Sequence, residues 1–188
     1  IELEQPAIDR ITATVPGGAA NVEDIYPLAP LQDGILYHHI AAERGDPYLL
    51  SAMLAMDSLQ RVEAFAAALN QVVVRHAVLR TAIAWDGLDQ PVQLVWRNAP
   101  LTVEVLQLDP AQGDIAAQLR KRFDPRHFRL DIRQAPMMRL ITAQDVPGGR
   151  WVTMLLSHHL IDDATSLKLM IGEIAGHLEG REAPQSTP

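Results

Sequence analysis

Two apolar segments, residues 137–145 and 150–157, are separated by the turn sequence VPGG, and this arrangement restricts the fold more than any other feature. Each segment has the length of a buried strand, and a short turn of this kind between two strands predicts a β-hairpin. Residues 78–86 and 91–97 form a second pair, with the turn dipeptide DG between them. Because hairpins pair antiparallel strands, the sheet cannot come from a regular alternation of parallel strands and helices.

Four segments have the apolar periodicity of helices. The clearest is residues 59–75, which follow Ser58, a residue type that caps helix N-termini. Residues 31–45 predict a shorter helix, for which Gly45 is the expected C-terminal stop. Further helices are expected at residues 114–123 and 165–180, and further strands at residues 49–57 and 101–108.

This pattern predicts an α/β fold, an α+β sandwich in which helices flank a mixed sheet. A chain of 188 residues is long enough for one hydrophobic core. Residues 1–24 are expected to be a lead-in segment, with a flexible break at VPGGAA and an extended approach after it. Residues 25–180 form the predicted domain, and the polar residues 181–188 are typical of the start of a linker.

Composition excludes several classes of partner. The net charge is -7 and the isoelectric point is about 5.4, which disfavours nucleic acid and anionic membrane surfaces. No apolar run approaches the ~20 residues that span a bilayer. The sequence has no cysteine, so it offers no thiol nucleophile or disulfide, and a reducing cytoplasmic location is expected.

A histidine doublet, His158 and His159, lies where the last predicted strand ends. Two aspartates follow it in a tight loop before a helix that begins near Thr165. Successive side chains of a strand point to opposite faces, so only one of the two histidines is expected to face a cleft. The same residues also fit plainer roles: Asp163 or Thr165 as a helix cap, and the histidines as structural side chains. No metal site is expected, because adjacent histidines on a strand diverge.

A second doublet, His38 and His39, lies on the predicted helix near the start of the domain. Neighbours on a helix diverge by about 100°, so at most one of the two is expected to face an active site.

Four segments together resemble the condensation domains of nonribosomal peptide synthetases. SHHLIDDATS resembles the family motif HHxxxDG, and RHAVLRT resembles the family block RHxxLRT. IYPLAPLQDGILYH is similar to the first sequence block, and RFDPRHFRLDIRQAPMMRL to the segment that leads into the histidine motif. The resemblance covers nearly all of residues 21–180, and the order of the four blocks makes it specific. Ala164 departs from the pattern, because the family motif has glycine there.

The upstream doublet resembles a motif of one subclass, the dual epimerisation/condensation domains. That motif is HH[I/L]xxxxGD, and residues 38–46 read HHIAAERGD, with a match at every fixed position. The resemblance implies two reactions in one site: racemisation at Cα of a donor aminoacyl thioester, then amide bond formation. A second interpretation is that HHIAAERGD is a rigid helix-to-loop joint, in which Gly45 adopts a left-handed cap and Asp46 pins the loop.

The resemblance also implies roles for single residues. His159 would be the principal catalytic residue, as a base or as a positioner of the acceptor amine. Asp163 would hold its loop through a structural salt bridge to Arg80, with Arg75 as the alternate partner, and His76 would be structural. The full set of implied catalytic residues is His159, His158, Asp163, His38 and His39, and the implied substrate-binding residues are Gly45 and Asp46.

The fold implied is that of chloramphenicol acetyltransferase, of which a condensation domain contains two lobes with the active site between them. The chain is expected to be the N-terminal lobe, with the C-terminal lobe as its partner and little activity alone. No cofactor is expected to bind directly. Upstream and downstream peptidyl carrier proteins would deliver both substrates on phosphopantetheine arms. The alternatives are an ordinary condensation domain, a dedicated epimerisation domain, an acyltransferase that uses a free acceptor, and a non-catalytic docking lobe.

Overall fold

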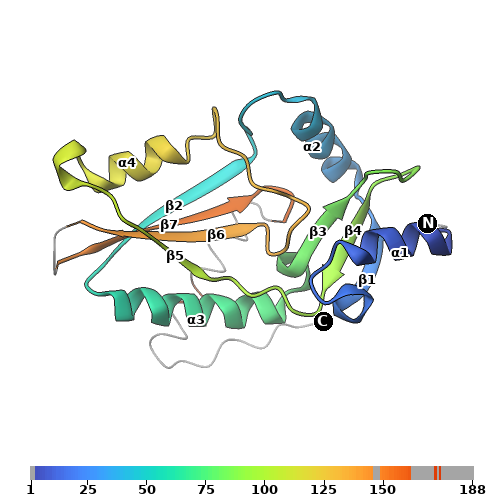
Figure 1. Ribbon diagram of the computed structural model, residues 1–188, viewed down its shortest axis with the longest axis horizontal. Coiled ribbons are helices and arrows are strands. Elements are labelled where there is room, and N and C mark those ends of the chain that lie inside the picture. Colours follow the sequence, from blue (N-terminus) through green and yellow to red (C-terminus); the bar gives the residue numbers. More distant parts are fainter. Residues whose placement is uncertain (1–2, 146–148, 162–171, 173, 175–188) are drawn as a thin grey trace.

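Two β-sheets organise the computed structural model, which describes residues 3–145, 149–161, 172 and 174 (Figure 1). The smaller sheet has three strands in the order β1-β4-β3, and both pairings are antiparallel. Its strands are β1 (Val22–Pro27), β3 (Thr81–Ala84) and β4 (Val92–Trp96). The DG turn predicted from the sequence joins β3 to β4, and Gly87 there has a φ of 69°, which favours glycine.

The larger sheet has the strand order β2-β7-β6-β5. Its strands are β2 (Leu49–Met56), β5 (Val103–Leu106), β6 (Met138–Gln144) and β7 (Trp151–His158). β6 and β7 form the antiparallel hairpin that the VPGG turn predicts, whereas β5 pairs with β6 in parallel. The sheet is therefore mixed, as expected from the sequence.

Helices cover both faces of the larger sheet (Figure 1). α3 (Leu59–Arg75) packs Leu69 and Val72 against one face, and α4 (Ile115–Arg122) packs Leu119 against the other. The two faces are apolar because β6 and β7 alternate buried residues between them. Leu140 and Leu155 face α3, and Ile141 and Met154 face α4. The predicted cap of α3 is confirmed, since the Ser58 hydroxyl accepts a hydrogen bond from the Arg61 amide at 3.2 Å.

The lead-in prediction for residues 1–24 misses a helix, α1 (Gln5–Ala13). Ile11 and Val15 are buried against β3 and β4, in a cluster that includes Leu94 and Trp96. The segment predicted as a flexible break is a turn followed by a 3₁₀ helix. The side-chain amide of Asn21, at the end of that helix, donates a hydrogen bond to the carbonyl of Pro16 at 2.9 Å. The apolar residues of α1 are too few and too interrupted to predict a helix without the sheet that they cover. The 3₁₀ helices are η1 (Gly18–Asn21), η2 (Ala77–Arg80) and η3 (Pro110–Gln112).

α2 (Pro30–Ala41) is shorter than the predicted helix. It ends at Ala41, and its C-cap residue Ala42 has extended backbone, so the prediction that Gly45 stops the helix is wrong. Gly45 does have a positive φ of 70°, but it lies in the loop that leads to β2.

The predicted helix at residues 165–180 lies outside the described residues, apart from Gly172 and Ile174, which are both helical. Ile174 is buried in the same cluster as Leu69 of α3. None of the helices described is both long and apolar enough to cross a bilayer.

Candidate functional site

The downstream doublet lies at the end of β7, where β2 begins. His158 is the cross-strand partner of Leu49, and the His159 N–H donates to the carbonyl of Tyr48 at 3.0 Å, which extends the same ladder by one residue. As expected for a strand, the two histidines point to opposite faces. His158 is fully buried, whereas His159 is partly exposed.

The upstream doublet divides in the same way. His39 is buried and His38 is exposed, which confirms that the two rings of this helix diverge. Each doublet therefore contributes one buried histidine and one that reaches the surface. The two buried histidines meet at one carboxylate, and the other two lie near one tyrosine ring.

Asp46 joins the two buried histidines. Its Oδ2 lies 2.5 Å from Nδ1 of His39 and 3.0 Å from Nε2 of His158. Its Oδ1 accepts a hydrogen bond from the Tyr48 amide at 2.9 Å. The Asp46 side chain is fully buried, so these three donors replace the water that a carboxylate otherwise needs.

The surrounding hydrogen bonds fix the tautomer of His158. The Leu160 amide donates to His158 Nδ1 at 3.1 Å, so this nitrogen carries no proton. The proton of the ring is therefore on Nε2, which donates to Asp46. In the same way, Nδ1 of His39 must donate, because the carboxylate can only accept.

The electrostatic balance at Asp46 favours the carboxylate. Burial by itself would raise the pKa of this group, but the hydrogen bonds from His158, from His39 and from the Tyr48 amide outweigh burial and lower the pKa well below its usual range. Asp46 is consequently a charged acceptor at neutral pH. We refer to His39, Asp46 and His158 as the buried triad.

The rings of the other two histidines both lie near the ring of Tyr48. Its ring is stacked on His159, with centroids 6.4 Å apart and planes 5° from parallel, and it lies 6.2 Å from the ring of His38. We refer to His38, Tyr48 and His159 as the aromatic row. Nδ1 of His159 is buried and has no hydrogen-bond partner among the described residues.

Gly45 holds the loop between the two doublets close to the segment after α4. A Cβ at this position would lie 2.3 Å from the carbonyl oxygen of Pro125, and the backbone is left-handed. The next amide, that of Asp46, donates to the same Pro125 carbonyl at 2.7 Å. The structure places Gly45 and Asp46 in the interior, and their predicted role in substrate binding stays a prediction.

Arg129 donates hydrogen bonds to two carbonyls at the end of α2. Its guanidinium donates to the carbonyl of Ala42 at 2.6 Å and to the carbonyl of His39. His39 lies in the last turn of α2 and Ala42 is its C-cap residue, so neither carbonyl has a donor within the helix. This arginine therefore helps to fix the position of the upstream doublet.

Arg80 is buried, as the predicted salt bridge requires, but its partner in the described chain is Glu23. The guanidinium lies 2.5 Å from the Glu23 carboxylate and also donates to the carbonyl of Trp96. Asp163, the expected partner, lies outside the described residues, so the pairing of Arg80 with Asp163 stays a prediction.

The buried triad is the group of described side chains whose atoms could bind a metal, because its ligand atoms all lie within 4.8 Å of one another. The hydrogen bonds fit such a site poorly. Both ring nitrogens approach the same carboxylate oxygen, and Nδ1 of His158 accepts a hydrogen bond from the Leu160 amide. A zinc ion would also need a fourth ligand or an open position, and this group is buried.

Sequence reasoning missed three residues around this site: Tyr48, Glu23 and Arg129. Tyr48 is two residues beyond the HHIAAERGD segment, and only the pairing of β2 with β7 brings it to His159. Glu23 and Arg129 are ordinary charged residues in the sequence, and the fold alone assigns their partners.

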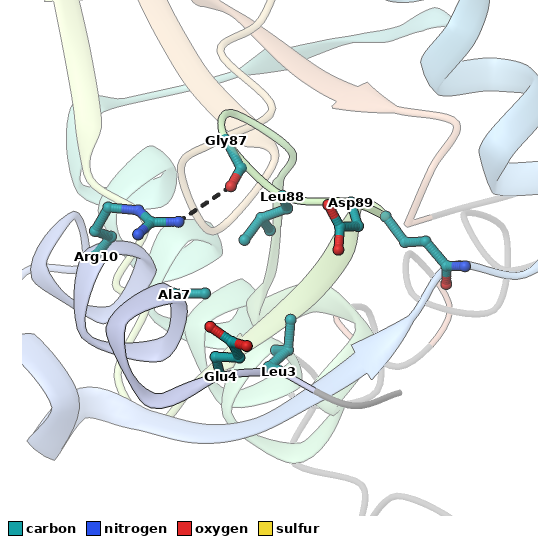
Figure 2. A pocket seen from close by; sticks show the side chains of 8 residues that line it. Leu3, Glu4, Ala7, Arg10, Gly87, Leu88 and Asp89 are labelled. Atoms are coloured by element: carbon teal, nitrogen blue, oxygen red, sulfur yellow. Dashed lines mark hydrogen bonds between the residues drawn. The ribbon is translucent and has the colours of Figure 1, made fainter.

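Two hollows lie elsewhere, beside α1. The larger, of about 690 Å³, is between α1 and the turn after β3, where Arg10 donates to the Gly87 carbonyl at 3.1 Å (Figure 2). The smaller, of about 340 Å³, has Trp85 and Arg133 in its wall. The described residues that line these two hollows include none of the four doublet histidines.

Comparisons of the sequence with protein-family models and with known proteins agree with one another. The sequence model of the condensation domain matches residues 22–188. The chain is 47% identical to malpibaldin synthetase of Mortierella alpina over 188 residues, which is all of this chain and 3% of that protein. It is 44% identical to malpinin synthetase of the same organism over 183 residues, 97% of this chain and 2% of that protein. The chain thus spans a small part of the curated relatives that it matches.

Solved structures show the same fold. The starter condensation domain of rhizomide synthetase matches 88% of this chain and 40% of its own, with a TM-score of 0.65 and 23% identity. The condensation domain of the Monacolin K polyketide synthase MokA matches 89% of this chain and 37% of its own, with a TM-score of 0.69 and 19% identity. The predicted α/β fold, with a mixed sheet and flanking helices, is therefore confirmed. On the evidence of its sequence and its fold, the chain belongs to the condensation domain family.

Proposed function

We propose that the chain is the N-terminal lobe of a nonribosomal peptide synthetase domain that both epimerises and condenses. The share of the rhizomide condensation domain that it matches, 40%, supports a single lobe. Leu31, Tyr37 and Ile40 remain largely exposed along α2, which is the kind of apolar surface that a second lobe would cover. The intact domain would accept its two substrates from upstream and downstream carrier proteins, each on a phosphopantetheine arm.

One observation supports the assignment of both epimerisation and condensation: the upstream and downstream doublets lie close together in the fold. His39 and His158 share a carboxylate oxygen, and the rings of His38 and His159 both lie near the same tyrosine ring. Residues at opposite ends of the sequence thus form one assembly. A motif used only to shape a distant surface would not need to reach the histidine motif.

In the condensation step, the neutral acceptor amine attacks the donor thioester carbonyl. The C–N bond forms, the C–S bond breaks, and the phosphopantetheine thiol leaves with a proton that the amine has lost. His159 is the partly exposed member of its doublet, so it would orient the amine or accept that proton. Asp163 keeps its expected role as the residue that holds the loop after the histidines.

In the epimerisation step, the Cα proton of the donor is removed beside the thioester and a proton returns to the other face. Histidine suits both transfers near neutral pH. His159 and His38 are the members of the two doublets that reach the surface, so we assign the proton chemistry to these two. His158 and His39 would act through the buried triad.

The stereochemistry of the product tests this function. The intact domain, with an L-aminoacyl donor and an acceptor on their carrier proteins, should release a dipeptidyl product whose donor residue is D by chiral chromatography. A product with an L donor residue would reduce the function to condensation. Turnover with free acceptor in place of its carrier would instead indicate a stand-alone acyltransferase, and carrier binding without product would indicate a docking lobe.

An ordinary condensation domain is the second candidate, and one observation favours it. His39 and Asp46 are buried and hydrogen-bonded to each other, so the upstream motif has a purely structural explanation. Under this alternative the doublet would shape the joint between α2 and β2, and the donor would keep its configuration.

A further inference from the structure

We propose that Asp46 is the positioning residue of the site: its carboxylate locks the two histidine doublets together and thereby sets the orientation of His159. This role rests on the proposed function, since it assumes that His159 acts on substrate. Asp46 itself touches no substrate in this account, because its side chain is fully buried. It would act through the two elements that flank His159, the end of β7 and the start of β2.

The first connection runs through His158. Asp46 accepts the hydrogen bond from Nε2 of His158, and the opposite nitrogen of that ring accepts one from the Leu160 amide. The backbone on both sides of His159 is therefore fixed by one imidazole. If the ring of His158 turned, the peptide groups that carry His159 would turn with it.

The second connection runs through Tyr48. Oδ1 of Asp46 accepts from the Tyr48 amide, and the Tyr48 carbonyl accepts from the His159 amide. The Tyr48 ring is then stacked on the His159 ring. Asp46 thus holds both the strand that carries His159 and the aromatic ring against which His159 packs.

A third connection ties in the upstream doublet. His39 donates to the same Oδ2 that accepts from His158, and Arg129 holds the carbonyl of His39. His38, the next residue back along α2, is thereby placed beside Tyr48. The aspartate is the point at which α2, β2 and β7 meet.

The network requires a carboxylate rather than an amide. Three N–H groups point at Asp46, two at Oδ2 and one at Oδ1, so both oxygens must accept. Asparagine has one acceptor and one donor of similar shape. In either orientation its NH₂ group faces at least one N–H, and a change of tautomer at His158 would cost the bond from Leu160. Asp46→Asn is therefore a nearly isosteric change that breaks the network.

Kinetics of the intact domain test the proposal. In Asp46→Asn we expect kcat for amide formation to fall about 10- to 100-fold, while KM for the donor carrier protein changes less than about 3-fold. The matched control is Asp57→Asn, an exposed aspartate just beyond the other end of β2, for which both constants should stay at wild-type values. A kcat within 2-fold of wild type in folded Asp46→Asn would overturn the proposal.

A second readout separates positioning from simple loss of folding. In the ¹⁵N spectrum of histidine-labelled wild type, His158 should be the Nε2–H tautomer, assigned by its loss in His158→Gln. Asp46→Asn should shift the signals of both His158 and His159 at temperatures where the variant is folded. Unmoved His159 signals, or a fall in kcat equal to the loss of folded protein, would contradict a positioning role. If Asp46→Asn does not fold, the wild-type spectrum alone decides, and a His158 ring protonated on Nδ1 with no proton on Nε2 would overturn the account.

Two further outcomes separate failure of the proposed function, or the presence of a metal, from failure of the positioning role. Wild type that forms amide bonds but leaves the donor as L would refute epimerisation, and the kcat of Asp46→Asn for amide formation would still decide the role of Asp46. One equivalent of zinc in the purified domain, with no Nε2–H signal from His158 until a chelator removes the metal, would replace the hydrogen-bonded triad with a metal site and overturn the proposal.

Discussion

At the scale of single residues, Gly45 and Asp46 meet different requirements in adjacent positions. Gly45 must have a left-handed backbone in contact with the Pro125 carbonyl, and only glycine satisfies both conditions. Asp46 must offer two buried acceptor oxygens to three donors. Gly45 therefore allows the backbone of the loop between the two doublets to take its shape, and Asp46 supplies the carboxylate that joins their buried histidines.

Substitution of Gly45 tests the first requirement. We expect Gly45→Ala to lower the free energy of unfolding by about 2–4 kcal/mol, through left-handed strain together with overpacking against Pro125. The control is Gly18→Ala, because Gly18 has a similar φ of 64° but no atom within 4 Å of the added Cβ. It should lose only about 1–2 kcal/mol in urea unfolding. Equal losses for the two variants would show that contact with Pro125 is unimportant.

The pH dependence of stability tests the charge on Asp46. Since the folded pKa of this carboxyl is depressed, its stabilising effect is present above the unfolded pKa of about 3.9 and is lost as pH falls through the folded pKa. Wild type should therefore exceed Asp46→Asn in unfolding free energy at pH 5, and the excess should shrink as pH falls below 4. Within the part of the chain that the structure describes, the titratable groups that face Asp46 are His39 and His158. A difference that grows on acidification would contradict the assigned charge.

At the scale of elements, the site depends on how the C-terminal end of α2 meets β2 and β7. α2 has no capping glycine, and Arg129 supplies donors to the carbonyls of its last turn instead. The strand pair fixes the opposite side, because the register that places Leu49 beside His158 also places Tyr48 beside His159. Loss of either connection would move one doublet relative to the other.

Replacement of Arg129 tests the attachment of α2. Arg129→Met keeps the aliphatic stem but removes the donors, and we expect a loss of about 1–3 kcal/mol in the free energy of unfolding, since two carbonyls of α2 lose their partner. The matched control is Arg126→Met, because Arg126 is exposed and its side-chain partner among the described residues is the nearby Asp124. Its urea midpoint should remain that of wild type. The attachment is refuted if both variants unfold at the same midpoint as wild type.

At the scale of the whole molecule, the two sheets and helices α1 to α4 bring the four doublet histidines to one end of the larger sheet. Under the proposed function, the other wall of the active site comes from a second lobe. The 188-residue chain should therefore form no peptide from loaded carrier proteins, whereas the intact domain should do so under the same conditions. Equal turnover by the chain alone, measured by mass spectrometry of the product, would refute the lobe assignment.

Much of the fold could be predicted because local signals agreed with the tertiary structure. Ser58 and the periodicity after it gave α3, and the turns gave both hairpins. α1 was missed because its burial depends on a sheet formed by residues much later in the chain. Gly45 was correctly predicted to have a left-handed backbone, but the prediction that it ends α2 was wrong. Its actual contact, with Pro125, joins loops that are far apart in sequence.

The candidate site was only partly predictable for the same reason. Spacing alone showed that each doublet would split between two faces, which follows from helix and strand geometry. It could not show that the split histidines pair across the fold at Asp46 and Tyr48. Those pairings depend on the register between β2 and β7 and on the place where α2 ends.

Deuterium exchange at the donor Cα is the first measurement to make, because it shows whether the two doublets form one site for proton chemistry. The intact domain would be incubated in D₂O with an L-aminoacyl carrier protein and no acceptor, beside His159→Ala and His38→Ala. We expect deuterium at Cα with wild type, none above the carrier-only control with His159→Ala, and a reduced rate with His38→Ala. Wild-type exchange no greater than that control, with amide bonds still formed once acceptor is added, would contradict this expectation.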